Sequence, residues 1–172
     1  GPGQVLLRVR TCGICGTDSH IVKGRFPTPN KPVILGHEFA GEVAAVGSDV
    51  KHIKEGDRAT ADINTACGHC EYCRNNQKLF CPKILQIGVH THGGLADYVI
   101  APAENIYILP KNMPFNHAAY IEPLACAIHG QKRIQVDVGE TVLILGAGPM
   151  GLTHTALSKK RGAGQVLVSE PN

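Results

Sequence analysis

The spacing of apolar residues divides the chain into two parts with different patterns. In the first part, short stretches of alternating or β-branched residues predict strands at 4–10, 39–46, 57–61, 93–100 and 106–109. A glycine-rich turn with polar Thr17 and Asp18 predicts the start of a short helix. Two further helices are expected at 116–120 and 124–134, with Pro123 in the first turn of the second.

The second part begins with a continuous apolar run, which is typical of a strand buried in a parallel sheet. The run covers residues 141–145 and is followed by a predicted helix that ends near residue 161. A second strand is predicted at 165–169. This order of strand, helix and strand is one β-α-β unit of an α/β domain.

The turn between that first strand and the helix reads Gly146-Ala-Gly148-Pro149-Met150-Gly151, the spacing of a dinucleotide-binding fingerprint. Its glycines allow a tight turn, close approach of the backbone to a pyrophosphate and close helix–strand packing. Glu170 lies 19 residues after Gly151, and a carboxylate there accepts hydrogen bonds from a ribose and repels a 2′-phosphate. We therefore predict NAD rather than NADP as cofactor; a glycine-rich turn without a ligand is the alternative.

Four of the seven cysteines lie close together, at Cys67, Cys70, Cys73 and Cys81. Structural zinc takes four protein ligands in a tetrahedron, so this spacing predicts a zinc ion that holds together a lobe at about residues 65–84. An iron–sulfur cluster is the main alternative, because Cys81 is followed by proline as in some ferredoxins. Those ferredoxins have three residues before the last cysteine, whereas this chain has seven.

Cys15, His37 and Glu38 form a second candidate set, because each of these side-chain types can bind zinc. A mixed set is typical of a catalytic zinc that keeps one position open for water or substrate. Glu122, beside Pro123 at a predicted helix start, is a further candidate, although an acid there also stabilises the helix dipole. Taken alone, a cysteine and a histidine in glycine-rich loops are more often packed core residues, which is the alternative for Cys15 and His37.

Composition and charge exclude several classes of protein. With 43% hydrophobic and 18% charged residues the chain is predicted to fold, and its net charge of +3 argues against a nucleic-acid partner. No apolar run approaches the roughly 18 residues that span a bilayer, so no membrane partner is expected. The first residues do not resemble a signal peptide, and clustered cysteines indicate a reducing compartment, so we predict a cytoplasmic location.

Together these motifs resemble the zinc-dependent medium-chain dehydrogenases, in the family's order and over almost the whole chain. The shared motifs are Cys12-Gly-Ile-Cys15-Gly-Thr17-Asp18-x-His20, Gly36-His37-Glu38, the four-cysteine lobe, Gly93-Gly94-x-Ala96-x-Tyr98 and the glycine fingerprint. The tract Glu122-Pro123-Leu124 resembles the polyol (sorbitol or L-iditol 2-) dehydrogenase branch.

The resemblance implies a fold and two domains. An α+β, GroES-like β-barrel catalytic domain with the zinc-binding lobe is expected at residues 1–134. The start of a truncated α/β Rossmann domain, its first β-α-β unit, is expected at 135–172. Because family members extend beyond both ends of this chain, we expect a fragment that keeps its structural zinc but is inactive alone.

The resemblance also implies the roles of the site residues. A catalytic zinc is held by Cys15 and His37 and, directly or through water, by Glu38 and Glu122; a structural zinc is held by the cysteine lobe. The catalytic zinc lowers the pKa of the substrate hydroxyl, and a hydride passes to the nicotinamide of NAD. Thr17 resembles the family's proton-relay hydroxyl, and His20 is expected to continue that relay.

The predicted activity is oxidation of a polyol or secondary alcohol by a zinc- and NAD-dependent enzyme, with a homodimer or homotetramer for the full-length protein. One alternative is an enzyme similar to L-threonine 3-dehydrogenase. Another is a non-catalytic, zinc-binding GroES-like module. A zinc-free quinone reductase relative is a third, which the cysteine lobe argues against.

Overall fold

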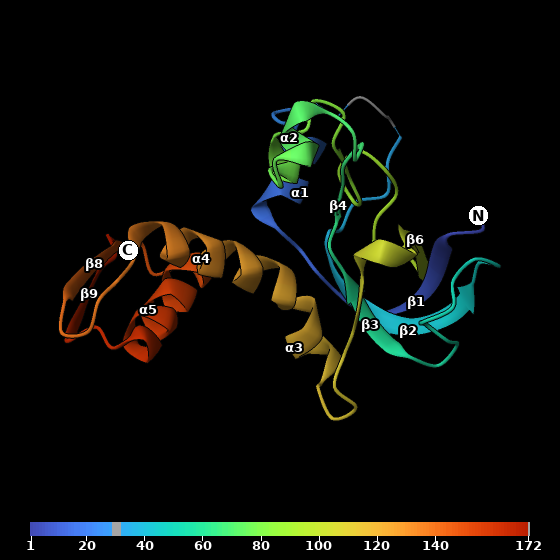
Figure 1. The fold of residues 1–172 in the computed structure, drawn as a ribbon. Helices are drawn as coiled ribbons and strands as arrows, with labels where there is room; N and C mark the ends of the chain where they lie inside the picture. The colour runs from blue at the N-terminus through green and yellow to red at the C-terminus, as the bar shows by residue number, and fades with distance from the viewer. Residues whose placement is uncertain (29–31, 172) are drawn as a thin grey trace. The chain divides into compact units, whose positions relative to one another are not determined.

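The computed structural model describes residues 1–28 and 32–171, and the chain divides by its contacts into two compact units, Gly1–Ile121 and Glu122–Asn172 (Figure 1). This division lies before the expected boundary at 134/135, because helix α4 (Ile121–Ile134) packs against helix α5 (Pro149–Arg161). Gln131 of α4 donates a hydrogen bond to the hydroxyl of Ser158 on α5 at 2.9 Å. A second hydrogen bond between the two helices comes from Arg161, in the last turn of α5, which donates to the carbonyl of Gln131 at 3.0 Å.

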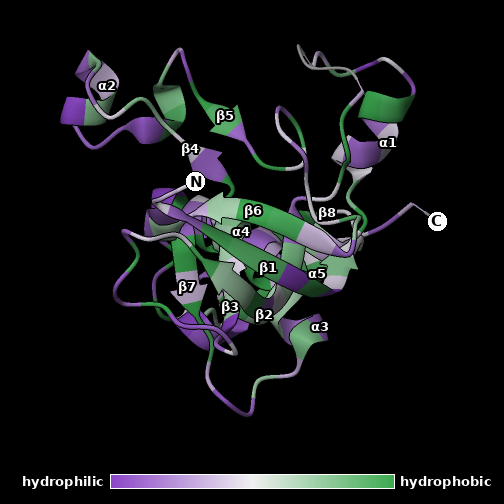
Figure 2. Ribbon diagram, turned by 90° about the vertical axis from the view of Figure 1, so that its right-hand side faces the viewer, coloured by the Kyte–Doolittle hydropathy of each residue, from purple (hydrophilic) through white to green (hydrophobic). Residues whose placement is uncertain are grey.

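An antiparallel sheet forms the core of the first unit, in the strand order β6-β1-β2-β3-β7. Its strands are β1 (Gln4–Gly13), β2 (Glu38–Val46), β3 (Arg58–Ala61), β6 (Tyr98–Pro102) and β7 (Ile106–Ile108). Alternate residues of β1 and β2 enter one hydrophobic core, in which Val5, Leu7 and Phe39 are almost fully buried. Figure 2 shows these strands mostly in the green of hydrophobic residues. The prediction of a first part built from short strands is confirmed.

Strand β1 continues three residues beyond its predicted end at Arg10. Its pairing with β2 shifts register between Leu6 and Leu7 and again between Val9 and Thr11. Such bulges bend a strand without ending its pairing, so β1 reaches Gly13, which pairs with Glu38. The end of β1 and the beginning of β2 therefore lie side by side.

Two predicted elements begin at other residues than the sequence indicated. Strand β6 begins at Tyr98 rather than near residue 93, because the backbone of residues 93–95 bonds to residues 34–36 instead. Helix α4 begins at Ile121, three residues before the predicted start. Helices α1 (Gly16–Val22) and α3 (Phe115–Ala119) lie close to their predicted positions, and η2 (Ala103–Asn105) is a 3₁₀ turn between β6 and β7.

The cysteine lobe contains only short elements: β4 (Asn64–Thr65), α2 (Glu71–Arg74), η1 (Lys78–Phe80) and β5 (Leu85–Gln86). An ion pair between Lys78 of η1 and Asp62 connects the lobe to the segment after β3. Apart from Cys81, the lobe contributes few buried side chains. Little apolar burial holds it together, as expected for a segment that a metal ion stabilises.

The second unit is the predicted β-α-β motif. Strands β8 (Thr141–Leu145) and β9 (Gln165–Ser169) pair in parallel, and α5 connects them. A Cβ at Gly151 would stand 2.0 Å from the carbonyl oxygen of Gly146, so only glycine lets α5 leave the turn this close to β8. Within the described part of the chain, no helix has both the length and the apolar composition needed to cross a membrane.

Candidate metal centres and coenzyme site

Three potential metal ligands come together where β1 ends and β2 begins. Cys15 caps the N-terminus of α1 two residues after β1, while His37 directly precedes β2 and Glu38 is its first residue. The ligand atoms of these three residues all lie within 4.8 Å of one another. We call this group the mixed-ligand centre. The pairing of Gly13 with Glu38 in the sheet accounts for the meeting of residues so far apart in sequence.

The donor set of the mixed-ligand centre fits a zinc ion. With Zn–S bonds of about 2.3 Å and Zn–N bonds of about 2.0–2.1 Å, sulfur and nitrogen ligands of one tetrahedral ion lie about 3.5 Å apart. The carboxylate of Glu38 has room because Gly13 lacks a side chain: a Cβ there would stand 2.2 Å from Glu38 Oε2. A tetrahedral ion bound to these three donors has one position left for a further ligand or a substrate.

Asp18 also belongs to this region, although the sequence did not indicate it as a site residue. It is 4% exposed, and its Oδ2 accepts a hydrogen bond from the backbone of Cys15 at 2.8 Å. Its Oδ1 accepts one from the backbone of Gly36 at 3.4 Å and lies 3.6 Å from Nδ1 of His37. Asp18 thus ties α1 to the segment that carries His37. An acid three residues after a helix-capping position was the sequence signal for this role.

The other predicted catalytic residues, Thr17, His20 and Glu122, differ in their position and exposure. Oγ1 of Thr17 lies 3.7 Å from Sγ of Cys15, whereas His20 is exposed on α1 one turn later. Glu122 lies in the second unit, in the first turn of α4, and its Oε1 is 3.7 Å from Sγ of Cys126. Cys126, on the same helix, is exposed.

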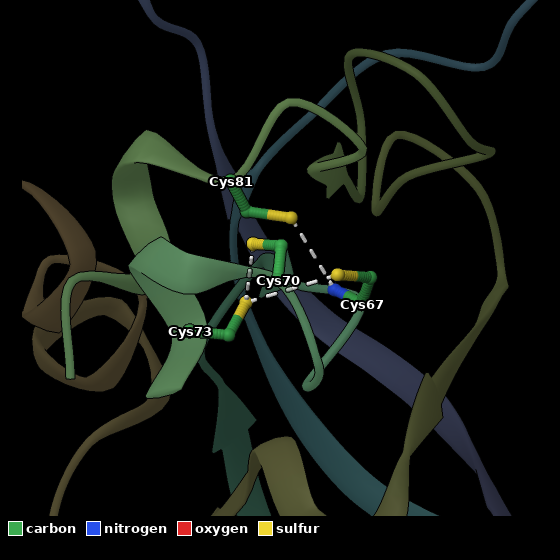
Figure 3. A group of neighbouring side chains, drawn as sticks. All are labelled: Cys67, Cys70, Cys73 and Cys81. Atoms are coloured by element: carbon green, nitrogen blue, oxygen red, sulfur yellow. Dashed lines mark hydrogen bonds between the residues drawn. The ribbon is translucent and has the colours of Figure 1, made fainter. Parts of the chain in front are cut away.

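The four clustered cysteines form a second group of close ligand atoms. Their sulfurs point toward one another from the loop before α2, from α2 itself and from the end of η1 (Figure 3). All four lie within 4.8 Å, with Cys67–Cys73 at 3.9 Å and Cys70–Cys73 at 3.5 Å. Sulfurs of one tetrahedral zinc lie about 3.8 Å apart, so the spacing fits a single ion. His69 is exposed, and its Nδ1 lies 2.7 Å from the carbonyl of Cys67.

The cysteine cluster contains thiols with opposite pKa shifts. Backbone amides of His69 and Cys70 donate to Cys67 and lower its pKa to about 6. Withdrawal from water and the hydrogen bond with Cys70 raise the pKa of Cys73 to about 12. A thiolate is the form that binds metal, so Cys67 is ready to bind at neutral pH, whereas Cys73 must release its proton to water when an ion binds.

The predicted coenzyme residues lie together in the second unit. Gly148 caps α5, Pro149 is its first residue and Met150 follows. Beyond β9, the Oε2 of Glu170 accepts a hydrogen bond from the backbone of Ala147 at 2.7 Å. The carboxylate predicted to bind a ribose therefore touches the same turn whose amides would face a pyrophosphate.

Comparison with known proteins agrees with these features. Residues 1–111 match the alcohol dehydrogenase GroES-like domain. D-arabitol-phosphate dehydrogenase of Enterococcus avium is 41% identical over 93% of this chain and 46% of that protein. L-threonine 3-dehydrogenase of Deinococcus deserti is 38% identical over 100% of this chain and 51% of that protein. A zinc-binding dehydrogenase of Sinorhizobium meliloti, solved with NADP, has a TM-score of 0.97 and 41% identity over 100% of this chain and 50% of that chain.

The chain therefore belongs to the medium-chain dehydrogenase family whose members carry this GroES-like domain, and the predicted fold class is confirmed. It spans about half the length of the curated relatives it matches.

Proposed function

We propose that the whole protein is a zinc-dependent oxidoreductase that transfers a hydride from a polyol, a polyol phosphate or a secondary alcohol to NAD. The observation that carries this proposal is the convergence of Cys15, His37 and Glu38 within 4.8 Å. A non-catalytic zinc module needs only the cysteine lobe and gives no reason for a second, mixed set of ligands. The relative that acts on D-arabitol phosphate, from its name, supports the polyol class of substrate.

Each residue at or near the mixed-ligand centre has a separate role in the proposed hydride transfer. Bound zinc supplies Lewis acidity that lowers the pKa of the substrate hydroxyl, and the nicotinamide accepts the hydride. Cys15 and His37 would hold the ion, and the carboxylates of Glu38 and Glu122, directly or through water, would moderate its charge. Thr17, whose Oγ1 lies 3.7 Å from the sulfur of Cys15, would accept the hydroxyl proton while it gives its own proton on toward His20, and the exposed ring of His20 would release a proton to water.

The coenzyme of this proposal is NAD, and the backbone amides at the N-terminus of α5 would bind its pyrophosphate. Glu170 receives the adenosine ribose and disfavours the 2′-phosphate of NADP by charge repulsion. The Sinorhizobium relative was solved with NADP, so this preference needs its own test. We expect the protein to bind NADH more tightly than NADPH by fluorescence titration, and Glu170→Gln to reduce the difference.

An enzyme similar to L-threonine 3-dehydrogenase is the second candidate, because that relative matches 100% of this chain at 38% identity. The zinc and coenzyme chemistry is the same for both substrates, so substrate comparison distinguishes them. We further propose that the whole enzyme is a cytoplasmic homodimer or homotetramer.

The test measures bound zinc and turnover on the same samples. We expect two zinc ions per chain, one in each group of ligands, and one in Cys15→Ser. The whole protein should reduce NAD with D-arabitol phosphate or sorbitol faster than with L-threonine, and Cys15→Ser should abolish turnover. One zinc per chain without turnover on any alcohol would support the non-catalytic module instead.

A further inference from the structure

Residues 88–95, here called the glycine clamp, lie against the segment that leads into His37. The amides of Gly93, Gly94 and Leu95 donate to the carbonyls of Ile34, Gly36 and Leu35, at 2.8, 2.7 and 2.9 Å respectively. In the opposite direction, the amide of Ile34 donates to Nδ1 of His92 at 3.1 Å. Four hydrogen bonds therefore fix the three residues that precede His37.

The two segments approach so closely that side chains cannot fit between them. A Cβ at Gly93 would stand 2.3 Å from the carbonyl oxygen of Gly36, and one at Gly88 would stand 2.4 Å from the same atom. The Cβ at Gly88 would also lie 2.9 Å from the backbone nitrogen of His37. A Cβ at Gly36 would stand 2.7 Å from the backbone nitrogen of Leu95 and equally 2.7 Å from the sulfur of Cys12. The backbone before His37 therefore has no room for a side chain at Gly36, Gly88 or Gly93.

The ring of His37 depends on this backbone for its position. The residue is 7% exposed, and its Nδ1 makes no hydrogen bond within the described residues, since Asp18 Oδ1 is 3.6 Å away. A ring without a hydrogen bond at that nitrogen is oriented by packing and by the backbone that carries it. Groups that orient a metal-binding histidine commonly change metal affinity 10- to 100-fold when mutated.

We propose that the glycine clamp is a positioning device for the mixed-ligand centre, with Gly93 and His92 as its key positioning residues. The clamp holds the ring of His37 at metal-binding distance from the sulfur of Cys15, so the affinity of this centre depends on residues that never touch the ion. The inference rests on the metal centre of the proposed function. It adds that residues 88–95 set the affinity of that centre.

The test compares zinc affinity at the two centres of the same protein by chelator competition. We expect Gly93→Ala to weaken the mixed-ligand centre at least 10-fold and to leave the cysteine cluster unchanged. His92→Leu should weaken the same centre, and His92→Asn should restore it, because the asparagine carbonyl can replace Nδ1 as acceptor for Ile34. Gly3→Ala is the matched control, since a Cβ at Gly3 meets nothing within 4 Å.

A second control separates positioning from general loss of stability. Val50 belongs to the main core but not to the clamp, so Val50→Ala should lower the unfolding temperature without changing the ratio of the two zinc affinities. The inference is overturned if Gly93→Ala keeps full affinity, if both centres weaken equally, or if His92→Asn is as weak as His92→Leu. If the unsubstituted protein binds zinc only at the cysteine cluster, the proposed metal centre fails and the clamp inference fails with it.

Discussion

Gly13→Ala is expected to displace the carboxylate of Glu38 and so weaken metal binding at the mixed-ligand centre. The new Cβ would stand 2.2 Å from Oε2, 3.1 Å from Cβ and 3.2 Å from Cδ of Glu38. Ordinary contacts between such atoms are about 3.5 Å, so the carboxylate must move by about 1 Å or more. A displaced ligand of this kind should cost about 10- to 100-fold in affinity, or about 1.4–2.7 kcal/mol.

The assay is competition with a chromogenic chelator, with the cysteine cluster as internal reference. Gly16→Ala is the control, because Gly16 lies in the same tract and a Cβ there meets nothing within 4 Å. In a Glu38→Ala background, Gly13→Ala should have no further effect, because the displaced group is gone. An affinity within twofold of the parent, or the same loss in both backgrounds, would show that Gly13 does not make room for the Glu38 carboxylate at the metal.

Three further outcomes test other parts of the structure. Cys70→Ser should reduce bound zinc from two ions to one and lower the unfolding temperature, measured by elemental analysis and calorimetry. Although burial acts to raise it, hydrogen bonds from Lys78 and Asn64 lower the pKa of Asp62. The stability that the ionised Asp62 contributes is present above about pH 4 and is lost as pH falls further. The free energy of unfolding should therefore fall less on acidification in Asp62→Asn than in the parent, by at most about 1 kcal/mol. Burial and the charge of Asp18 raise the pKa of Cys12 to about 11, so iodoacetamide at pH 8 should leave Cys12 unmodified in peptide mass spectra.

Local patterns predicted the elements that depend on local sequence. The cysteine spacing indicated the lobe, and the glycine turn between an apolar run and a helix indicated the β-α-β unit, because a short tract determines each. The meeting of Cys15 with His37 depends on the register of β1 against β2, and two bulges set that register. Hydrophobic alternation does not reveal bulges, so the sequence offered these ligands only as candidates.

The parts that sequence missed are those made by backbone contacts between distant segments. Gly93 was expected to open a strand, because glycine before alternating residues usually marks a turn. Its amide bonds instead to Ile34, about sixty residues earlier, and the strand begins at Tyr98. The contact of α4 with α5 is of the same kind, because the buried side-chain amide of Gln131 donates to Ser158 on α5, a contact that local patterns do not reveal.

Anomalous diffraction at the zinc edge, from crystals of the protein, locates its bound zinc directly. We expect two peaks, one among the four cysteine sulfurs and one within bonding distance of Cys15 and His37, at about 2.3 Å from sulfur and 2.0–2.1 Å from nitrogen. A single peak at the cysteine cluster, from crystals grown with zinc in excess, would contradict this expectation.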